Sequence, residues 1–118
     1  MGKNNEKEYL QKEIILFPCP YSDFSGNKIR PGIILSNNSY NQNNQDILIA
    51  PITTKYKNNY SLKITKENLI NGRIAHDSEI RTDKIMPINK SIIITQIAIT
   101  TDEILILIIN KLLNLIQN

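Results

Sequence analysis

The stretch that decides the fold is Glu13–Asn37, EIILFPCPYSDFSGNKIRPGIILSN. Its two apolar runs, Ile14–Phe17 and Ile33–Leu35, are short and β-branched, which predicts two buried strands. The polar loop between them is too long for a tight hairpin turn and ends at Arg30-Pro31. Because proline biases the preceding residue towards extended backbone, the Arg30 guanidinium is expected to project from a defined position. Loops held by a rigid scaffold often carry function, so Arg30 is a candidate active-site residue.

Outward from this hairpin, the same pattern of short β-branched runs predicts further strands, and the chain closes with a helix. The spacing of Thr100 and Glu103 matches a capping box, which predicts the start of that helix. Asn71-Gly72 is a strong turn signal between two strands. Mostly antiparallel strands with a terminal helix predict a mainly β, α+β domain, a small SH3-like antiparallel barrel. The strands are expected near residues 13–19, 32–37, 46–53, 59–65, 73–81 and 90–98.

Two segments between these strands have a distinct composition. The Asn-rich stretch Asn37–Gln45 is predicted to be a polar loop. Pro87 cannot donate to a sheet ladder, which predicts an edge or loop segment over Lys84–Ile88.

The length of 118 residues suits one domain with its own core. Residues 1–12 are charged and are predicted to form a flexible tail, which leaves 13–118 as the folded domain. The net charge of +3 favours contact with a polyanion or an acidic partner, although ordinary solubility explains it equally well. A single cysteine excludes an internal disulfide, and with a single histidine we expect neither a metal site nor a cofactor.

The N-terminal residues lack the apolar core of a secretion signal. The longest apolar run, Ile104–Ile109 with its extension to Ile116, falls short of the ~20 residues that span a bilayer. The sequence therefore predicts a soluble cytoplasmic protein with no membrane partner.

The predicted terminal helix is apolar on more than one side. Residues 104, 105, 108, 109, 112, 113 and 116 form a broad apolar stripe. Ile106, Leu107 and Leu115 lie off that stripe. A terminal helix of a small domain cannot easily bury both sides in its own core, which favours a homodimer interface. The alternative is that the sheet curls around the helix.

Three ordered segments of the chain resemble the MazF/PemK toxins of bacterial type II toxin–antitoxin pairs. They are Phe17–Pro31 (FPCPYSDFSGNKIRP), Asp46–Thr54 (DILIAPITT) and Ser78–Lys84 (SEIRTDK), followed by the terminal helix. The resemblance implies a CcdB/PemK-like fold. It also implies a sequence-specific, ribosome-independent and metal-independent endoribonuclease that cleaves single-stranded mRNA. Attack by the 2′-hydroxyl would leave 2′,3′-cyclic phosphate and 5′-hydroxyl ends. The implied partner is an acidic, partly disordered antitoxin.

Cleavage of this kind needs a base, an acid and a cation beside the phosphate. Arg30 offers a fixed charge with forked donors, and Thr53 offers a neutral hydrogen bond. By resemblance, the family's paired catalytic Arg and Ser/Thr correspond to Arg30 and Thr53. The alternative for Thr53 is a strand-end hydroxyl that bonds local backbone. His76, the only histidine, is a candidate general base or acid, and the alternative is a merely exposed or structural side chain.

The remaining candidates would hold RNA. Tyr21 and Phe24 are expected to stack on unpaired bases, although Phe24 is equally suited to anchor its loop against the barrel. Lysines would attract phosphates. Arg81 either contacts RNA or pairs with Asp83 to tie down a loop. The residues expected to contact RNA are Tyr21, Ser22, Asp23, Phe24, Ser25, Gly26, Asn27, Lys28, Lys55, Ser78 and Arg81.

Two rival functions share this fold. One is a CcdB-like toxin that binds gyrase without catalysis, and the other is a barrel that binds RNA or a partner without cleaving it. Arg30 and Thr53 argue against the first, because a gyrase-binding toxin has no need of them. Two residues depart from the family pattern, since Glu13 and Ala98 stand where the family commonly has glycine.

Overall fold

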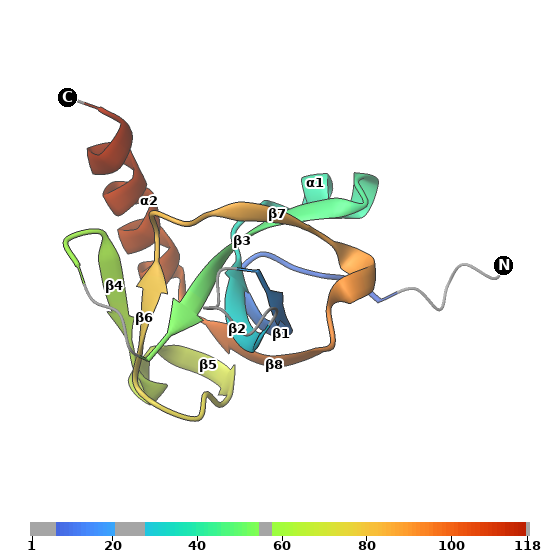
Figure 1. Ribbon diagram of the computed structural model, residues 1–118, viewed down its shortest axis with the longest axis horizontal. Coiled ribbons are helices and arrows are strands. Elements are labelled where there is room, and N and C mark those ends of the chain that lie inside the picture. Colours follow the sequence, from blue (N-terminus) through green and yellow to red (C-terminus); the bar gives the residue numbers. More distant parts are fainter. Residues whose placement is uncertain (1–6, 21–27, 55–57, 118) are drawn as a thin grey trace, which may run out of the picture.

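The computed structural model describes residues 7–20, 28–54 and 58–117 (Figure 1). Its strands form one eight-stranded, antiparallel sheet in the order β4-β6-β3-β2-β1-β8-β5, and β7 pairs with β3 beside that path. The strands are β1 (Glu13–Cys19), β2 (Lys28–Ile34), β3 (Asp46–Thr53), β4 (Ser61–Ile64), β5 (Leu69–Gly72), β6 (Ser78–Arg81), β7 (Met86–Asn89) and β8 (Thr95–Thr100). The helices are α1 (Asn38–Asn43) and α2 (Asp102–Ile116), with the short 3-10 turns η2 (Lys66–Asn68) and η3 (Lys90–Ile92).

The sheet curves into a half-barrel, and α2 packs at the end that carries β4 and β6 (Figure 1). This mostly antiparallel sheet with a C-terminal helix is the mainly β, α+β architecture predicted from the sequence. The expected central hairpin is also present, because β1 pairs with β2 from Ile14 opposite Ile33 to Cys19 opposite Lys28.

Both faces of the sheet are covered by apolar side chains, because successive residues of a strand point to opposite faces. Ile14 of β1 belongs to a cluster that includes Ile104 and Ile108 of α2. Ile15 and Phe17 belong to a second cluster with residues of β3 and β7. Each of these side chains is fully shielded from solvent, and such burial contributes about 1.5–3 kcal/mol per large side chain. The hairpin strands are therefore fixed from both sides.

Gly32 lies where the hairpin meets the second cluster. A Cβ atom on this residue would come within 2.8 Å of Phe17 Cε1 and 3.2 Å of Ile49 Cδ1. The glycine that follows Arg30-Pro31 thus makes room for the Phe17 ring, and packing of this ring fixes the strand that carries Arg30.

The Asn-rich stretch predicted to be a loop instead contains the short helix α1. The Asn37 side chain caps it by accepting from the Tyr40 amide at 2.8 Å. Asn41 is buried, and its Nδ2 donates to the Tyr9 carbonyl at 2.9 Å and to the Ser36 carbonyl at 3.0 Å. Composition alone suggested a loop, whereas capping and a buried amide specify one helical turn here.

The N-terminal segment that precedes β1 is attached to the domain. Besides the bond from Asn41 to Tyr9, the Gln11 side chain donates to the Leu35 carbonyl at 2.7 Å. Lys12 has a positive φ of 80° and pairs through its ammonium group with Asp102 at the start of α2. Residues 9–12, which fall within the predicted tail, are therefore hydrogen-bonded to the domain.

Several boundaries differ from the sequence prediction. The strand expected over 32–37 spans Lys28–Ile34, and the strand expected over 90–98 spans Thr95–Thr100. The strand expected over 73–81 begins only at Ser78, and Asn71-Gly72 ends β5. The edge segment predicted around Pro87 is confirmed as strand β7, which among the described residues pairs only with β3. Helix α2 is capped by Thr101, which accepts from the Ile104 amide, rather than by Thr100.

Candidate functional site

The side chains of Arg30 and Thr53 meet across the boundary between β2 and β3. Gly32 lies opposite Pro51 in this antiparallel ladder, and the same register continued by two residues sets Arg30 opposite Thr53. The Nη1 atom of Arg30 donates to Thr53 Oγ1 at 3.4 Å, and both residues are half-buried. The structure thus brings together the guanidinium and the hydroxyl that the sequence pointed to.

Thr53 has neighbours on both sides because β3 is shared between three strands. The first half of β3 pairs with β7, whereas Ile52 and Thr53 pair with Ile80 and Glu79 of β6. Directly paired residues of an antiparallel ladder point to the same face at a Cβ separation of about 4.5–5.5 Å. Thr53 therefore lies between Arg30 on one side and Glu79 on the other.

Glu79 was not among the residues selected from the sequence. It lies opposite Lys63 of β4 as well as Thr53 of β3. The Ser61 hydroxyl donates to Glu79 Oε1 at 2.9 Å. A signal was present in the segment SEIR, where buried Ile80 separates Glu79 from Arg81 and so assigns both charged side chains to the opposite face.

Arg81 and Asp83 form a forked ion pair. Arg81 Nε lies 2.9 Å from Asp83 Oδ1, and Arg81 Nη2 lies 3.1 Å from Oδ2. The hydrogen bond from Arg81 holds the pKa of the Asp83 carboxyl below its ordinary value of 3.8, and partial burial only weakens this effect. A second bond, from Asn58 Nδ2 at 3.5 Å, reaches Asp83 Oδ2. This geometry matches the loop-tying pair that was one alternative for Arg81.

His76 lies in the exposed loop between β5 and β6. Its backbone carbonyl accepts a hydrogen bond from Ser78 Oγ at 2.8 Å. Ser78 is buried and lies opposite Ile64 of the core, so it faces away from the side that carries Thr53. No hydrogen bond within the described ranges joins the His76 ring to Arg30.

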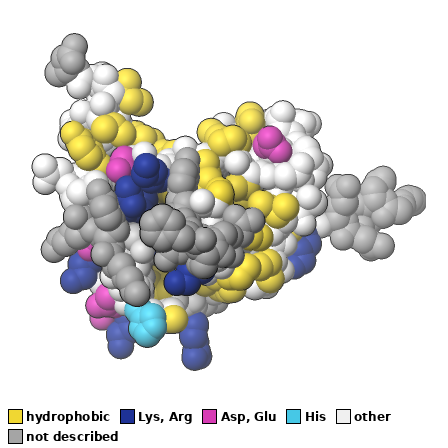
Figure 2. Space-filling view, viewed as in Figure 1, with side chains coloured by type: hydrophobic (Ala, Val, Ile, Leu, Met, Phe, Trp, Pro, Cys, Tyr) yellow, Lys and Arg dark blue, Asp and Glu magenta, His cyan; other side chains and the backbone are white. Residues whose placement is uncertain are grey.

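Most of the residues expected to contact RNA lie outside the described residues. These are Tyr21, Ser22, Asp23, Phe24, Ser25, Gly26, Asn27 and Lys55. Lys28 is described, and it is exposed at the first position of β2. Figure 2 shows further Lys and Arg side chains around the left side and along the lower edge of the visible face.

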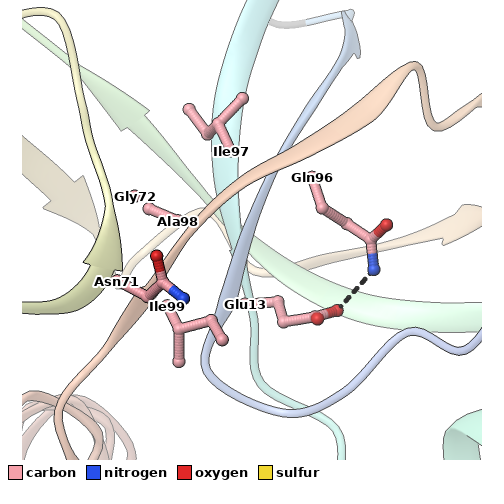
Figure 3. Close-up of a pocket in the computed structure, with 7 residues that line it drawn as sticks. All are labelled: Glu13, Asn71, Gly72, Gln96, Ile97, Ala98 and Ile99. Carbon is pink, nitrogen blue, oxygen red and sulfur yellow. Dashed lines mark hydrogen bonds between the residues drawn. The ribbon is translucent and has the colours of Figure 1, made fainter.

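A pocket of about 280 Å³ lies elsewhere on the sheet, where β5 and β8 meet the start of β1. Glu13 Oε1 accepts from Gln96 Nε2 at 2.9 Å at one side of this pocket (Figure 3). Its other lining residues are Asn71, Gly72, Ile97, Ala98 and Ile99. The pocket includes none of the residues around Arg30, so it is a separate feature. Glu13 and Ala98, the departures from the family pattern, both lie here.

Within the described ranges, no group of three or more His, Cys, Asp or Glu residues could hold a metal ion. No helix in the same ranges is long and apolar enough to cross a membrane.

The model of the PemK-like, MazF-like toxins of type II toxin–antitoxin systems matches residues 10–116. The chain belongs to this family of toxins. The match covers the hairpin, the strands around Thr53 and all of α2.

Solved structures agree with this assignment at the level of the fold. MazF (Form-I) from Deinococcus radiodurans is 16% identical, with a TM-score of 0.75 over 93% of this chain and 97% of that one. An endoribonuclease in complex with its cognate antitoxin, from a mycobacterial species, is 16% identical with a TM-score of 0.72, covering 90% and 92%. The Mycobacterium tuberculosis toxin MazF-mt6 is 18% identical with a TM-score of 0.70, covering 86% and 93%. No curated protein matches the chain.

Proposed function

We propose that this toxin is a sequence-specific, ribosome-independent and metal-independent endoribonuclease that cleaves single-stranded mRNA. The observation that carries the proposal is the contact between Arg30 and Thr53 at the end of the central hairpin. Membership of the MazF-like toxin family supports it, as does similarity of fold to a protein described as an endoribonuclease.

The chemistry assigned to these residues begins with the ribose 2′-oxygen, which attacks the adjacent phosphorus. Negative charge then builds on the non-bridging oxygens, where the forked donors of Arg30 stabilise it. Thr53 adds a neutral donor to the same phosphate. The bond to the 5′-oxygen breaks, which leaves a 2′,3′-cyclic phosphate and a 5′-hydroxyl. Because the nucleophile is a hydroxyl of the substrate and the cation is a guanidinium, this route needs no metal.

RNA would be held by the loop before β2 and by nearby cations. We propose that Tyr21 and Phe24 stack on unpaired bases. Lys28 and Lys55 would contact phosphates, so RNA affinity should fall with rising salt. The exposed Lys28, at the start of the strand that carries Arg30, fits this arrangement.

The proposed protein partner is an acidic, partly disordered antitoxin, in the cytoplasm. Several structural neighbours were solved with an antitoxin, including the MazE–MazF complex (Form-III) from Deinococcus radiodurans, which is 16% identical with a TM-score of 0.73 over 92% of this chain and 96% of that one. The basic net charge of +3 suits such a partner.

The test of this function is incubation of the purified protein with a long mixed-sequence RNA in excess EDTA, followed by mapping of the RNA ends. We expect discrete cuts at one short sequence with 5′-hydroxyl ends. Intact RNA over a wide range of substrates and pH would contradict the proposal. Inhibition of gyrase supercoiling without loss of RNA would favour a CcdB-like toxin. Tight binding to intact RNA would favour a non-catalytic barrel.

We further propose that the toxin is a homodimer through the outer side of α2. Only Ile104 and Ile108 of this helix are buried. Ile106, Ile109, Leu113 and Ile116 follow one stripe of the helix, and they are 57%, 46%, 45% and 75% exposed. Apolar side chains along α2 are visible at the upper left of Figure 2. A helix of this kind is covered most simply by a second copy of itself.

Sedimentation tests the dimer. We expect a dimer at micromolar concentration for the natural protein and a monomer for the double variant Ile109→Lys, Leu113→Lys, because two buried charges would oppose association. Asn114→Lys is the matched control, since Asn114 is exposed on the same helix away from the stripe. A natural protein that sediments only as a monomer at this concentration would contradict the dimer.

A further inference from the structure

We propose that Glu79 is the general base that takes the proton from the ribose 2′-hydroxyl, an inference that rests on the proposed endoribonuclease function. Neither the sequence pattern nor the resemblance pointed to this residue. Its place in the sheet does so, because Glu79 of β6 is directly paired with Thr53 of β3.

The register places three candidate groups in one row on one face of the sheet. Arg30 contacts Thr53 from β2, and Glu79 flanks Thr53 from β6. A phosphate that is held by Arg30 and Thr53 would therefore have the backbone position of Glu79 on its other side, whereas the Glu79 carboxylate in this structure reaches Ser61 of β4, on the side of β6 away from Thr53. A base must be within hydrogen-bonding reach of the proton that it removes, so the Glu79 side chain turns from Ser61 towards β3 in the proposed reaction.

The Glu79 carboxylate is available. Its Oε1 lies 2.9 Å from the hydroxyl of Ser61, a buried residue whose single proton is also within hydrogen-bonding distance of the Asn58 carbonyl at 3.0 Å. In the described part of the chain, this is the one hydrogen bond that the side chain makes. Oε2 thus keeps its lone pairs for a proton.

The other candidates for a base are less suited. Both oxygens of Asp83 are bonded to Arg81, and this pair holds the pKa of Asp83 below its ordinary value. A weaker base that is already occupied is a poor proton acceptor. His76 lies in an exposed loop, and the neighbouring residue Ser78 faces the core rather than Thr53. By contrast, the pairing of β6 with β3 places the residue Glu79 directly opposite Thr53, which Arg30 contacts.

The proposed step moves one proton to Glu79, forms one bond to phosphorus and breaks another. The 2′-hydroxyl proton moves to Glu79 Oε2, and the freed oxygen lone pair forms the bond to phosphorus. The bond from phosphorus to the 5′-oxygen breaks, and that oxygen keeps the electron pair and takes a proton from water. The protonated Glu79 then returns its proton to solvent, which regenerates the carboxylate.

The deciding variant is Glu79→Gln, which keeps the size of the side chain and an oxygen for the Ser61 bond but cannot accept a proton. We expect single-turnover cleavage to fall by about 100-fold or more, with RNA affinity within about threefold of the natural protein. Glu67→Gln is the matched control, because Glu67 Oε1 also accepts a side-chain hydroxyl, from Thr65 at 3.0 Å, on an exposed turn. This control should cleave at the natural rate.

A second readout separates a base from a group that protonates the leaving oxygen. In RNA with sulfur in place of the scissile 5′-oxygen, the leaving group needs no proton. The defect of Glu79→Gln should persist on this substrate. Full recovery there would overturn the assignment as base, and so would cleavage of ordinary RNA within threefold of the natural rate. Equal losses of affinity and rate would also overturn it, because they indicate a binding role.

Folding of each variant is checked by its denaturant midpoint. If Glu79→Gln does not fold, the role of Glu79 is tested with Glu79→Asp, which keeps the carboxylate on a side chain that is one methylene shorter. A rate loss of tenfold or more at unchanged affinity supports the base role, and a natural rate overturns it. Failure of the natural protein to cleave any RNA would instead refute the proposed endoribonuclease. Normal cleavage by Glu79→Gln beside an active natural protein would refute only the role of Glu79.

Discussion

Arg30→Ala is expected to abolish RNA cleavage while the protein stays folded. The guanidinium is the positive group that contacts Thr53 Oγ1. In the proposed mechanism it stabilises the negative charge that develops on the phosphate oxygens. Loss of one such preorganised donor typically costs about 100- to 1000-fold in rate. Arg30 is only half-buried, so its removal leaves the apolar clusters intact. Single-turnover cleavage and a denaturant midpoint measure the two outcomes.

Two further variants make this result specific. Arg30→Lys keeps a positive charge but loses the forked donors, so we expect an intermediate rate. Lys28→Ala removes an exposed cation at the first position of the same strand, and it should weaken RNA binding and reduce its dependence on salt without abolishing cleavage. Cleavage at the natural rate by Arg30→Ala would remove the arginine from the mechanism.

Gly72→Ala is expected to be among the most destabilising single-atom changes in the chain. Gly72 has a φ of +78°, and a Cβ atom built there would lie 2.1 Å from the Ile97 carbonyl oxygen and 2.5 Å from Ala98 Cα. Both are backbone atoms of β8, so β5 and β8 would have to separate. Left-handed backbone costs a non-glycine residue about 1–2 kcal/mol, and the clash adds to it. We expect a loss of roughly 2–4 kcal/mol in the free energy of unfolding.

Denaturant unfolding measures this loss. Asn71→Ala is the control, because Asn71 is exposed on the same strand and already has a Cβ atom. The control should stay within about 0.5 kcal/mol of the natural protein. An unchanged midpoint for Gly72→Ala would mean that β5 does not pair with β8 as described.

The sequence predicted the central hairpin well because its signals are local. Buried runs, a long loop and Arg30-Pro31 all lie within one stretch of chain, and β1 and β2 pair accordingly. Helix α1 was missed for the opposite reason. Its Asn-rich composition resembles a loop, and the buried contact of Asn41 with the distant Tyr9, which helps to hold it as a helix, is not visible in the local sequence.

In the candidate site, too, the residues with local signals were predicted and a residue that depends on distant strand pairing was missed. Arg30 was selected from its loop and the following proline, Thr53 was paired with it through the family resemblance, and the structure places the two in contact. Glu79 was missed because its neighbourhood depends on how β6 pairs with β3, two strands that are distant in the sequence. Alternation within SEIR indicates which face Glu79 occupies, but not which residue lies beside it.

The sharing of β3 between β7 and β6 also limits how such a toxin can be controlled. Arg30, Thr53 and Glu79 lie on three neighbouring strands of one hydrogen-bonded sheet, and the apolar clusters pack against both faces of its hairpin. Moving the backbone of one of these residues out of line would require the strand pairing around it to break, whereas its side chain can turn without such a change. An inhibitor that spares the fold would therefore silence the proposed site by occupying it or by turning its side chains. Such silencing would be reversible, because the sheet that positions the three residues stays intact.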